Sequence, residues 1–116
     1  MPQRPINKYT HYHAHIYFNE STLNQAIALC ENAGEIFEVT VGQIHEKLVG
    51  PHPCWSCQIF FTSDVFEELI SWLDAHRSSL NILVHPLTGN NLEDHTVYAS
   101  WLGESTKLNL SIFQAS

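Results

Sequence analysis

Hydrophobic and polar positions alternate strictly over residues 10–18, THYHAHIYF. The even positions from 12 to 18 are apolar or aromatic, whereas His11, His13, His15 and Tyr17 occupy odd positions. Alternation with a period of two predicts a β-strand that buries one face and presents the other. We therefore expect the three histidines and Tyr17 to share the face of a sheet that does not meet the hydrophobic core.

Three stretches have the spacing of amphipathic helices instead. Capping oxygens at residues 19–22 precede apolar residues at helical spacing over residues 23–30, and Gly34 is expected to end this helix. A second apolar stripe covers residues 65–73. A third, short helix is expected over residues 92–102, ended by a glycine.

Segments rich in β-branched and aromatic residues predict three more strands, at residues 36–41, 55–61 and 80–85. Gly42 is expected to form a bulge after the second strand, and residues 108–110 to add an edge strand. The order β-α-β-β-α-β with a C-terminal extension predicts a single ferredoxin-like α+β domain over residues 1–116. Its antiparallel sheet should carry both helices on one face, with strand order 4-1-3-2.

The same alternation assigns the side chains of the other strands to faces. The residues expected on the face away from the helices are Glu38, Thr40, His45, Ser56, Gln58, Phe60, Leu83 and His85. A sheet face that includes apolar residues such as Leu83 and Phe60 is seldom left bare. We therefore expect a homodimer in which two such faces pack together.

Charge and composition limit the possible partners. Among 116 residues there are 12 Asp+Glu but 5 Lys+Arg, a formal net charge of -7, which argues against nucleic acid or an anionic membrane as a partner. We find no apolar segment typical of a signal peptide or a membrane span. The 3 cysteines, an odd number, are expected to be reduced thiols in the cytoplasm. Cys54 and Cys57 should point to opposite faces of one strand, which excludes a redox pair.

Histidine is the unusual component, because its 8 copies outnumber all Lys and Arg. His13 and His15 lie on one strand face, about 7 Å apart at Cα. Antiparallel pairing should bring His85 beside His11 or His13. Because imidazole is the commonest metal ligand, this group predicts a metal site. The alternative is an exposed polar face without a ligand.

Other histidines have more than one interpretation. His52 lies between two prolines, so a stiff loop would present it either as an acid–base group or as an exposed turn residue. His95 follows Asp94, which could simply cap a helix. His76 ends a helix, where a cation interacts well with the helix dipole, and we assign it no functional role.

Five short motifs, in their order and spacing, resemble those of the DOPA 4,5-dioxygenase family. They are YHAHIY at 12–17, IHEKLVGPHP at 44–53, ILVHPLTG at 82–89, DHT at 94–96 and WLGE at 101–104. The resemblance extends over about residues 12–110. Ile44 and Leu48 depart from it, since Trp and Pro are expected there, and these departures concern substrate shape more than metal binding.

The resemblance implies dependence on non-haem Fe(II) and extradiol ring cleavage of a catechol such as DOPA, with O2 as co-substrate. We expect the metal ligands to be His13, His15 and His85. The expected acid–base residues are His52 and His95, and the expected substrate contacts are His45, Tyr17 and Gln58. Two alternatives stay open for the ligand set: one that includes a carboxylate, for which Glu38 is the candidate, and one that consists of histidines alone. Zn(II) could substitute for iron.

Two other functions stay open at this stage. The domain could be a non-catalytic module that binds a metal or a small aromatic ligand, or the histidine face could be only a dimer interface. Metal analysis separates the interface from the other two, and O2 uptake with catechols separates the enzyme from the binding module.

Overall fold

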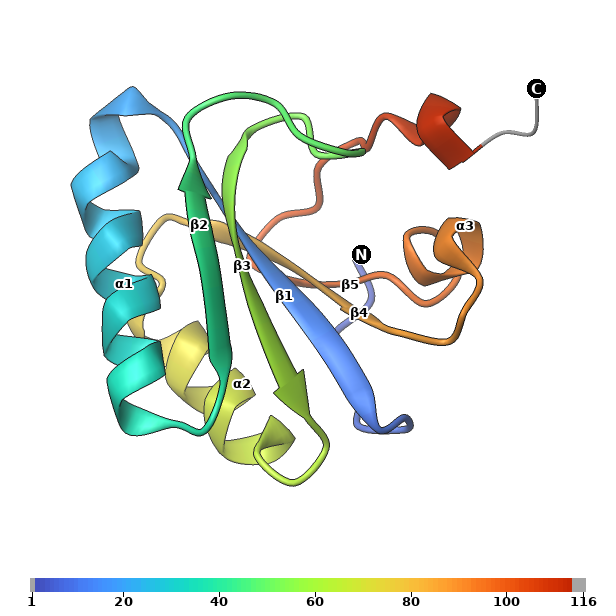
Figure 1. The fold of residues 1–116 in the computed structure, drawn as a ribbon, viewed down its shortest axis with the longest axis horizontal. Coiled ribbons are helices and arrows are strands. Elements are labelled where there is room, and N and C mark those ends of the chain that lie inside the picture. The colour runs from blue at the N-terminus through green and yellow to red at the C-terminus, as the bar shows by residue number, and fades with distance from the viewer. Residues whose placement is uncertain (1, 114–116) are drawn as a thin grey trace.

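A five-stranded antiparallel sheet, with α1 and α2 against one face, forms the frame of the computed structural model, which describes residues 2–113 (Figure 1). The strands are β1 (His11–Phe18), β2 (Thr40–His45), β3 (Trp55–Thr62), β4 (Asn81–Pro86) and β5 (Ser100–Leu102). The helices are α1 (Leu23–Ile36), α2 (Phe66–His76) and α3 (Asn91–Asp94), with 3-10 turns η1 (Glu20–Thr22) and η2 (Leu110–Phe113). No helix within residues 2–113 is long and apolar enough to cross a bilayer.

The strand order β2-β3-β1-β4-β5 confirms the predicted ferredoxin-like arrangement, with β5 added beyond β4. β1 lies at the centre and alternates as predicted. Its even positions are buried beneath the helices together with Cys57, Ile59 and Phe61 of β3. Its odd positions therefore face the other side of the sheet, where His13 pairs with His85 of β4 and with Phe60 of β3.

Two predicted boundaries around the first helix are wrong. α1 continues through Gly34 to Ile36, and β2 begins at Thr40 rather than at residue 36. A Cβ at Gly34 would lie 3.1 Å from Cγ2 of Val41, so this glycine allows α1 to approach β2 closely instead of ending the helix. The bulge is confirmed, because the β2–β3 register shifts between Val41 and Ile44.

The predicted helix over residues 92–102 is also wrong. Only Asn91–Asp94 are helical, and Ser100–Leu102 instead pair with β4. The free edge of β4 offers unpaired backbone groups, and pairing with that edge decides the conformation of a segment whose apolar spacing is ambiguous. Residues 108–110 form no strand either, since the chain there enters the η2 turn.

The sheet face opposite the helices is covered in part by the chain itself. Tyr17, Leu83 and Trp101 form a second buried cluster, against which Cys54 and Leu108 pack. Leu83 is 0% exposed, so it does not contribute to a bare apolar face. The homodimer stays a prediction, and of the two apolar residues on which it was based only Phe60 remains. Cys54 lies with this cluster, whereas Cys57 lies in the helix-side core, as the alternation predicted.

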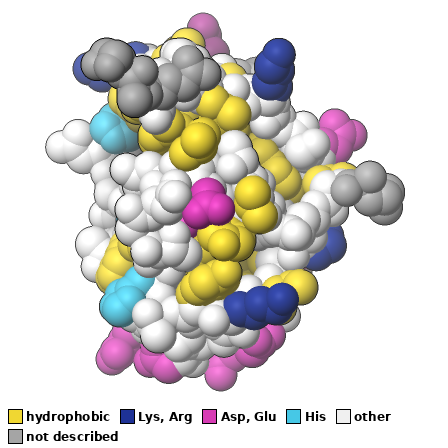
Figure 2. Space-filling model, turned by 90° about the vertical axis from the view of Figure 1, so that its right-hand side faces the viewer, with side chains coloured by type: hydrophobic (Ala, Val, Ile, Leu, Met, Phe, Trp, Pro, Cys, Tyr) yellow, Lys and Arg dark blue, Asp and Glu magenta, His cyan; other side chains and the backbone are white. Residues whose placement is uncertain are grey.

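The side of the molecule that carries α3 has its own apolar surface. Figure 2 shows that side face-on, with hydrophobic side chains gathered along its middle and basic side chains at its margins. Exposed large hydrophobic residues of the segments there are Leu87, Leu92, Val97 and Ile112. Part of the apolar surface of the domain therefore lies on the side that carries α3.

Candidate metal site

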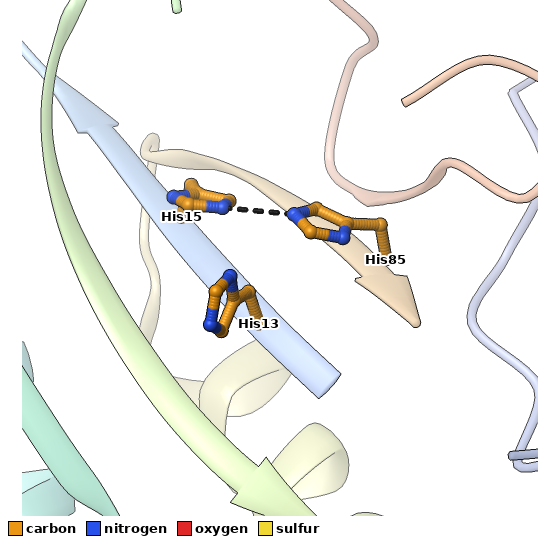
Figure 3. Close-up of side chains that lie close together, drawn as sticks. All are labelled: His13, His15 and His85. Atoms are coloured by element: carbon orange, nitrogen blue, oxygen red, sulfur yellow. Dashed lines mark hydrogen bonds between the residues drawn. The ribbon is translucent and has the colours of Figure 1, made fainter. Parts of the chain in front are cut away.

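Three histidines from two paired strands form the centre of the site (Figure 3). His13 and His15 project from β1, and His85 from β4 is the direct strand partner of His13. One ring nitrogen of each lies within 4.8 Å of the corresponding nitrogens of the other two. The Nε2 atoms of His15 and His85 are 3.0 Å apart. The expected juxtaposition of His85 with His13 is therefore confirmed.

The strands hold these side chains without help from loops. β1 is flanked on both sides by paired strands, so its alternate residues project in fixed directions. His15 is 5% exposed and His85 is 1% exposed, whereas His13 is half-buried at the edge of the group. The group, which we call the His triad, thus consists of two buried donors and one half-buried donor.

Burial keeps the His triad unprotonated at neutral pH. Desolvation, followed by the nearby His95, lowers the pKa of His85 to about 3. Desolvation and four neighbouring histidines hold the pKa of His15 well below 6.5, and the pKa of His13 is also lowered, mainly by burial. Neutral imidazole is the form that binds metals, so the protonation state suits a ligand set.

The orientation of His85 also suits a metal ligand. Its Nδ1 donates to the carbonyl oxygen of Pro86 at 2.9 Å, which leaves the lone pair of a neutral ring on Nε2, the atom that faces His15. Two nitrogens bound at right angles to one ion at about 2.1 Å lie about 3 Å apart. The three residues therefore fit a metal ion, and the His triad could hold one.

No carboxylate joins this group among residues 2–113. Glu38, the predicted candidate, is exposed and precedes β2, which is separated from β1 by β3. The structure therefore favours the all-histidine alternative over a set completed by Glu38.

His52 lies directly over His15, with ring centroids 4.1 Å apart. It is 7% exposed, so it is a buried residue rather than an exposed turn residue. Its Nδ1 lies 2.7 Å from the hydroxyl of Tyr17. Burial, followed by the charges of neighbouring histidines, lowers the pKa of His52 to about 4, whereas burial raises the pKa of Tyr17, so both groups are neutral at pH 7.

His95 completes a five-histidine cluster beside His85, as His52 does beside His15. Its ring centroid is 4.1 Å from that of His85 and 6.3 Å from that of His52. Its Nδ1 donates to the carbonyl oxygen of Asn91 at 2.7 Å. The ring of Phe113, from η2, lies 4.8 Å from that of His95, so the C-terminal turn covers this histidine.

The interpretation of Asp94 as the cap of α3 is wrong. Asn90 caps this helix by accepting from the backbone N–H of Glu93 at 3.0 Å. The buried Asp94 carboxylate instead accepts from the N–H and the hydroxyl of Thr88, at 3.1 and 2.5 Å. These bonds join the two ends of the turn after β4 and so position His95. The only sign of this role of Asp94 in the sequence was that an acidic residue stands beside a histidine.

The remaining predicted substrate contacts lie on the same face but outside the His triad. Gln58 of β3 is the strand partner of His15, and His45 of β2 is the partner of Ser56, which in turn pairs with Tyr17. Both Gln58 and His45 are half-buried. His76 is exposed at the end of α2 and stacks on Trp72, away from this cluster.

One positioning contact was not predicted at all. The backbone N–H of Asn109 donates to the carbonyl oxygen of Pro51 at 2.8 Å, directly before His52. Leu108 meanwhile packs on the cluster of Tyr17, Leu83 and Trp101. The C-terminal segment thus holds the loop of His52, and no short motif in the sequence signals a contact between segments so far apart.

The sequence of this chain is similar to those of two curated fungal proteins. A DOPA 4,5-dioxygenase of Amanita muscaria is 34% identical over an alignment of 109 positions that covers 86% of this chain and 48% of the relative. An uncharacterized 21.2 kDa protein of Botryotinia fuckeliana is 37% identical over an alignment of 86 positions that covers 67% of this chain and 47% of the relative. The chain spans about half the length of these curated relatives.

A solved structure and a family model agree with them. The crystal structure of a "putative dioxygenase" from Nostoc punctiforme PCC 73102 superposes with a TM-score of 0.85 at 39% identity, covering 88% of this chain and 89% of that one. Residues 12–112 match the model of the Dopa 4,5-dioxygenase family. The chain therefore belongs to the Dopa 4,5-dioxygenase family.

Proposed function

We propose that this chain is a non-haem, Fe(II)-dependent dioxygenase that opens a catechol ring with O2 by extradiol cleavage. The observation that carries the proposal is the His triad, three unprotonated imidazoles with nitrogens within 4.8 Å of one another, in a member of this family. The name of the Amanita muscaria relative favours a catechol such as DOPA as the substrate.

His13, His15 and His85 would hold the metal. A redox-active ion bound there would mediate electron transfer between the catechol and O2, whose two atoms both end in the ring-opened product. Binding requires lone pairs on the nitrogens that face the ion, so the proton shared between His15 and His85 in the metal-free protein must leave their facing Nε2 atoms. The hydrogen bond from His85 to Pro86 already holds one of these rings in the required tautomer.

His95 and His52, which lie beside different members of the His triad, are proposed to move protons there. Because a carbonyl oxygen can only accept, His95 keeps its proton on Nδ1 towards Asn91, and its Nε2 is free to take a proton from a catechol hydroxyl. The hydroxyl of Tyr17 can donate to Nδ1 of His52, which places the proton of neutral His52 on Nε2. His95 would then be the base. Neutral His52 would donate a hydrogen bond from Nε2 to the reacting oxygen, and it would act as the acid once the proton taken from the catechol has protonated its ring.

Substrate contacts are proposed for Gln58 and His45, which lie half-buried on the same sheet face. Tyr17 is assigned a different part, because its hydroxyl is buried against His52. We expect it to act on the substrate through the orientation of His52.

The test is anaerobic reconstitution with Fe(II), followed by O2 uptake with a series of catechols and absorbance of the yellow ring-opened product. Uptake that depends on both metal and catechol supports the proposal, and His76→Ala serves as an exposed-histidine control. Metal binding with no O2 uptake for any catechol would contradict it and favour a binding module. The homodimer, a separate proposal, is contradicted by a monomer in light scattering at micromolar concentration.

A further inference from the structure

A cavity lies on the helix side of β4, across the strand from the five-histidine cluster. It encloses about 240 Å³, and its inner wall includes Tyr12, Phe66 and Val84 of the helix-side core. Residues 3–9 form its outer wall, and they lie outside the stretch 12–112 that matches the family. His85 borders this cavity as well, so the cavity meets the His triad at this one residue.

The outer wall is fixed along its length. The backbone of Gln3 accepts from the N–H of Trp101 at 2.8 Å, so the N-terminal segment runs beside β5. Arg4 pairs with Asp74 at 2.9 Å and donates to the carbonyl oxygen of Trp101 at 3.2 Å. These contacts tie the beginning of the wall to the sheet edge and to α2.

The end of the wall is held by a single hydroxyl. The oxygen of Tyr12 accepts from the backbone N–H groups of Lys8 and Tyr9, at 2.9 and 2.7 Å, and donates to the side chain of Asn7 at 3.0 Å. Asn7 in turn donates to the carbonyl oxygen of Ser63 at 3.1 Å. The cavity is therefore preformed, which lowers the entropic cost of binding a ligand.

Its lining is unlike the rest of this acidic chain. The cavity is bordered by three of the 4 tyrosines, at positions 9, 12 and 98, and by two of the 5 basic residues, Arg4 and Lys8. No Asp or Glu is among its described lining residues. The ion pairs within residues 2–113 involve Arg4, Asp74 and Arg77, so Lys8 has no carboxylate partner there. Arg4 has five N–H donors, of which its contacts leave several free.

Size and lining together define a ligand class. Tyr9 and Tyr98 form an aromatic pair with centroids 5.6 Å apart, and Tyr12 and Phe66 form another at 4.8 Å. Aromatic walls favour a planar ring, and a guanidinium with an ammonium favours a carboxylate. Pockets for drug-sized ligands measure about 300–1,000 Å³, so this cavity suits a molecule with one ring.

We propose that this cavity is a second ligand site that binds a monocyclic aromatic carboxylate. Its carboxylate contacts Lys8 and Arg4, and its ring lies against Tyr9 and Tyr98. The site is independent of metal and of turnover, because its recognition groups come from residues 3–9 and 98 rather than from the five-histidine cluster.

The test is calorimetric titration of 4-hydroxybenzoate into the metal-free full chain. This probe carries a carboxylate and one ring but lacks the adjacent hydroxyls of a catechol. We expect saturable one-to-one binding that weakens about tenfold or more in Lys8→Gln, the usual effect of losing one charge-assisted contact. Lys47→Gln, an exposed lysine of the β2–β3 loop, and His13→Ala should bind as the parent does.

Two further measurements test the roles of the carboxylate and of the aromatic wall separately. The neutral 4-hydroxybenzamide should bind more weakly than the acid by a similar factor, and Tyr98→Leu should weaken the acid while circular dichroism stays unchanged. The proposal is overturned by the absence of saturable binding up to about 10 mM. It is equally overturned if Lys8→Gln binds normally, or if His13→Ala rather than Lys8→Gln loses the ligand.

Discussion

The hydroxyl of Tyr17 lies 2.7 Å from Nδ1 of His52, and both side chains are buried. Tyr17 belongs to the central strand and His52 to the loop between β2 and β3, so this bond fixes a loop residue to the most rigid part of the sheet. It also determines which ring nitrogen of His52 carries the proton, and the first prediction follows from this.

Replacing Tyr17 by Phe should leave metal binding intact and lower turnover about tenfold, because His52 loses the partner that fixes its tautomer. Single-turnover kinetics and metal analysis measure the two effects separately. In a His52→Ala background the same replacement should have almost no further effect on turnover. Independent, multiplicative losses in the double variant would contradict the idea that Tyr17 acts through His52.

The His triad should lose metal when either strand histidine is removed. We expect His13→Ala and His15→Ala each to lose most of the bound metal, because each takes away one of only three donors. His76→Ala, at the exposed end of α2, should keep its metal. Elemental analysis after reconstitution gives the metal content, and equal content in all three variants would refute the assignment.

The remaining histidines should divide between binding and catalysis. We expect His85→Ala to lose metal, whereas His52→Ala keeps it but loses turnover by about 10²-fold or more, the usual contribution of an acid–base group. Metal content and turnover of the two variants decide the matter. A metal-free His52→Ala protein beside a loaded His85→Ala protein would reverse the two roles.

The metal-free protein should lose stability as the pH falls from 7 towards 5. The pKa values of His52 and His85, about 4 and about 3 in the folded state, lie below the ordinary value of 6.5. Between these values the unfolded chain binds protons that the folded chain does not, so stability falls with falling pH, by about 1.4 kcal/mol per pH unit for each such group.

Urea denaturation of the metal-free protein at several pH values between 7.5 and 5 measures this loss. His85→Gln should show a shallower dependence on pH, and His76→Gln the same dependence as the parent. Stability that is constant or higher towards pH 5 would show that the buried imidazoles are protonated in the folded chain.

The strand-borne part of the site could be predicted from the sequence because one physical rule determines it. In a central strand with one buried face, the parity of the apolar residues fixes the direction of every side chain, which placed His13, His15 and His85 together. The same rule assigned Cys54 and Cys57 to opposite sides of the sheet.

The loop-borne part could not be predicted, because it depends on contacts between distant segments. The apolar spacing of residues 92–102 indicated a helix, but pairing of Ser100–Leu102 with β4 decided the structure. The bond between Tyr17 and His52, and the one between Asn109 and Pro51, join residues 35 and 58 positions apart, which no local pattern reports.

Three of the five histidines lie on strands of the sheet, and the other two lie on segments that connect strands. The ligands of the His triad are carried by paired strands, whereas His52 and His95 are carried by connecting segments that tolerate substitution and insertion more readily. Evolution, or a designer, can therefore reshape the surroundings of the His triad by altering residues 46–54 and 87–99 alone. The same frame could in this way accept different ligands while the three strand-borne histidines stay in place.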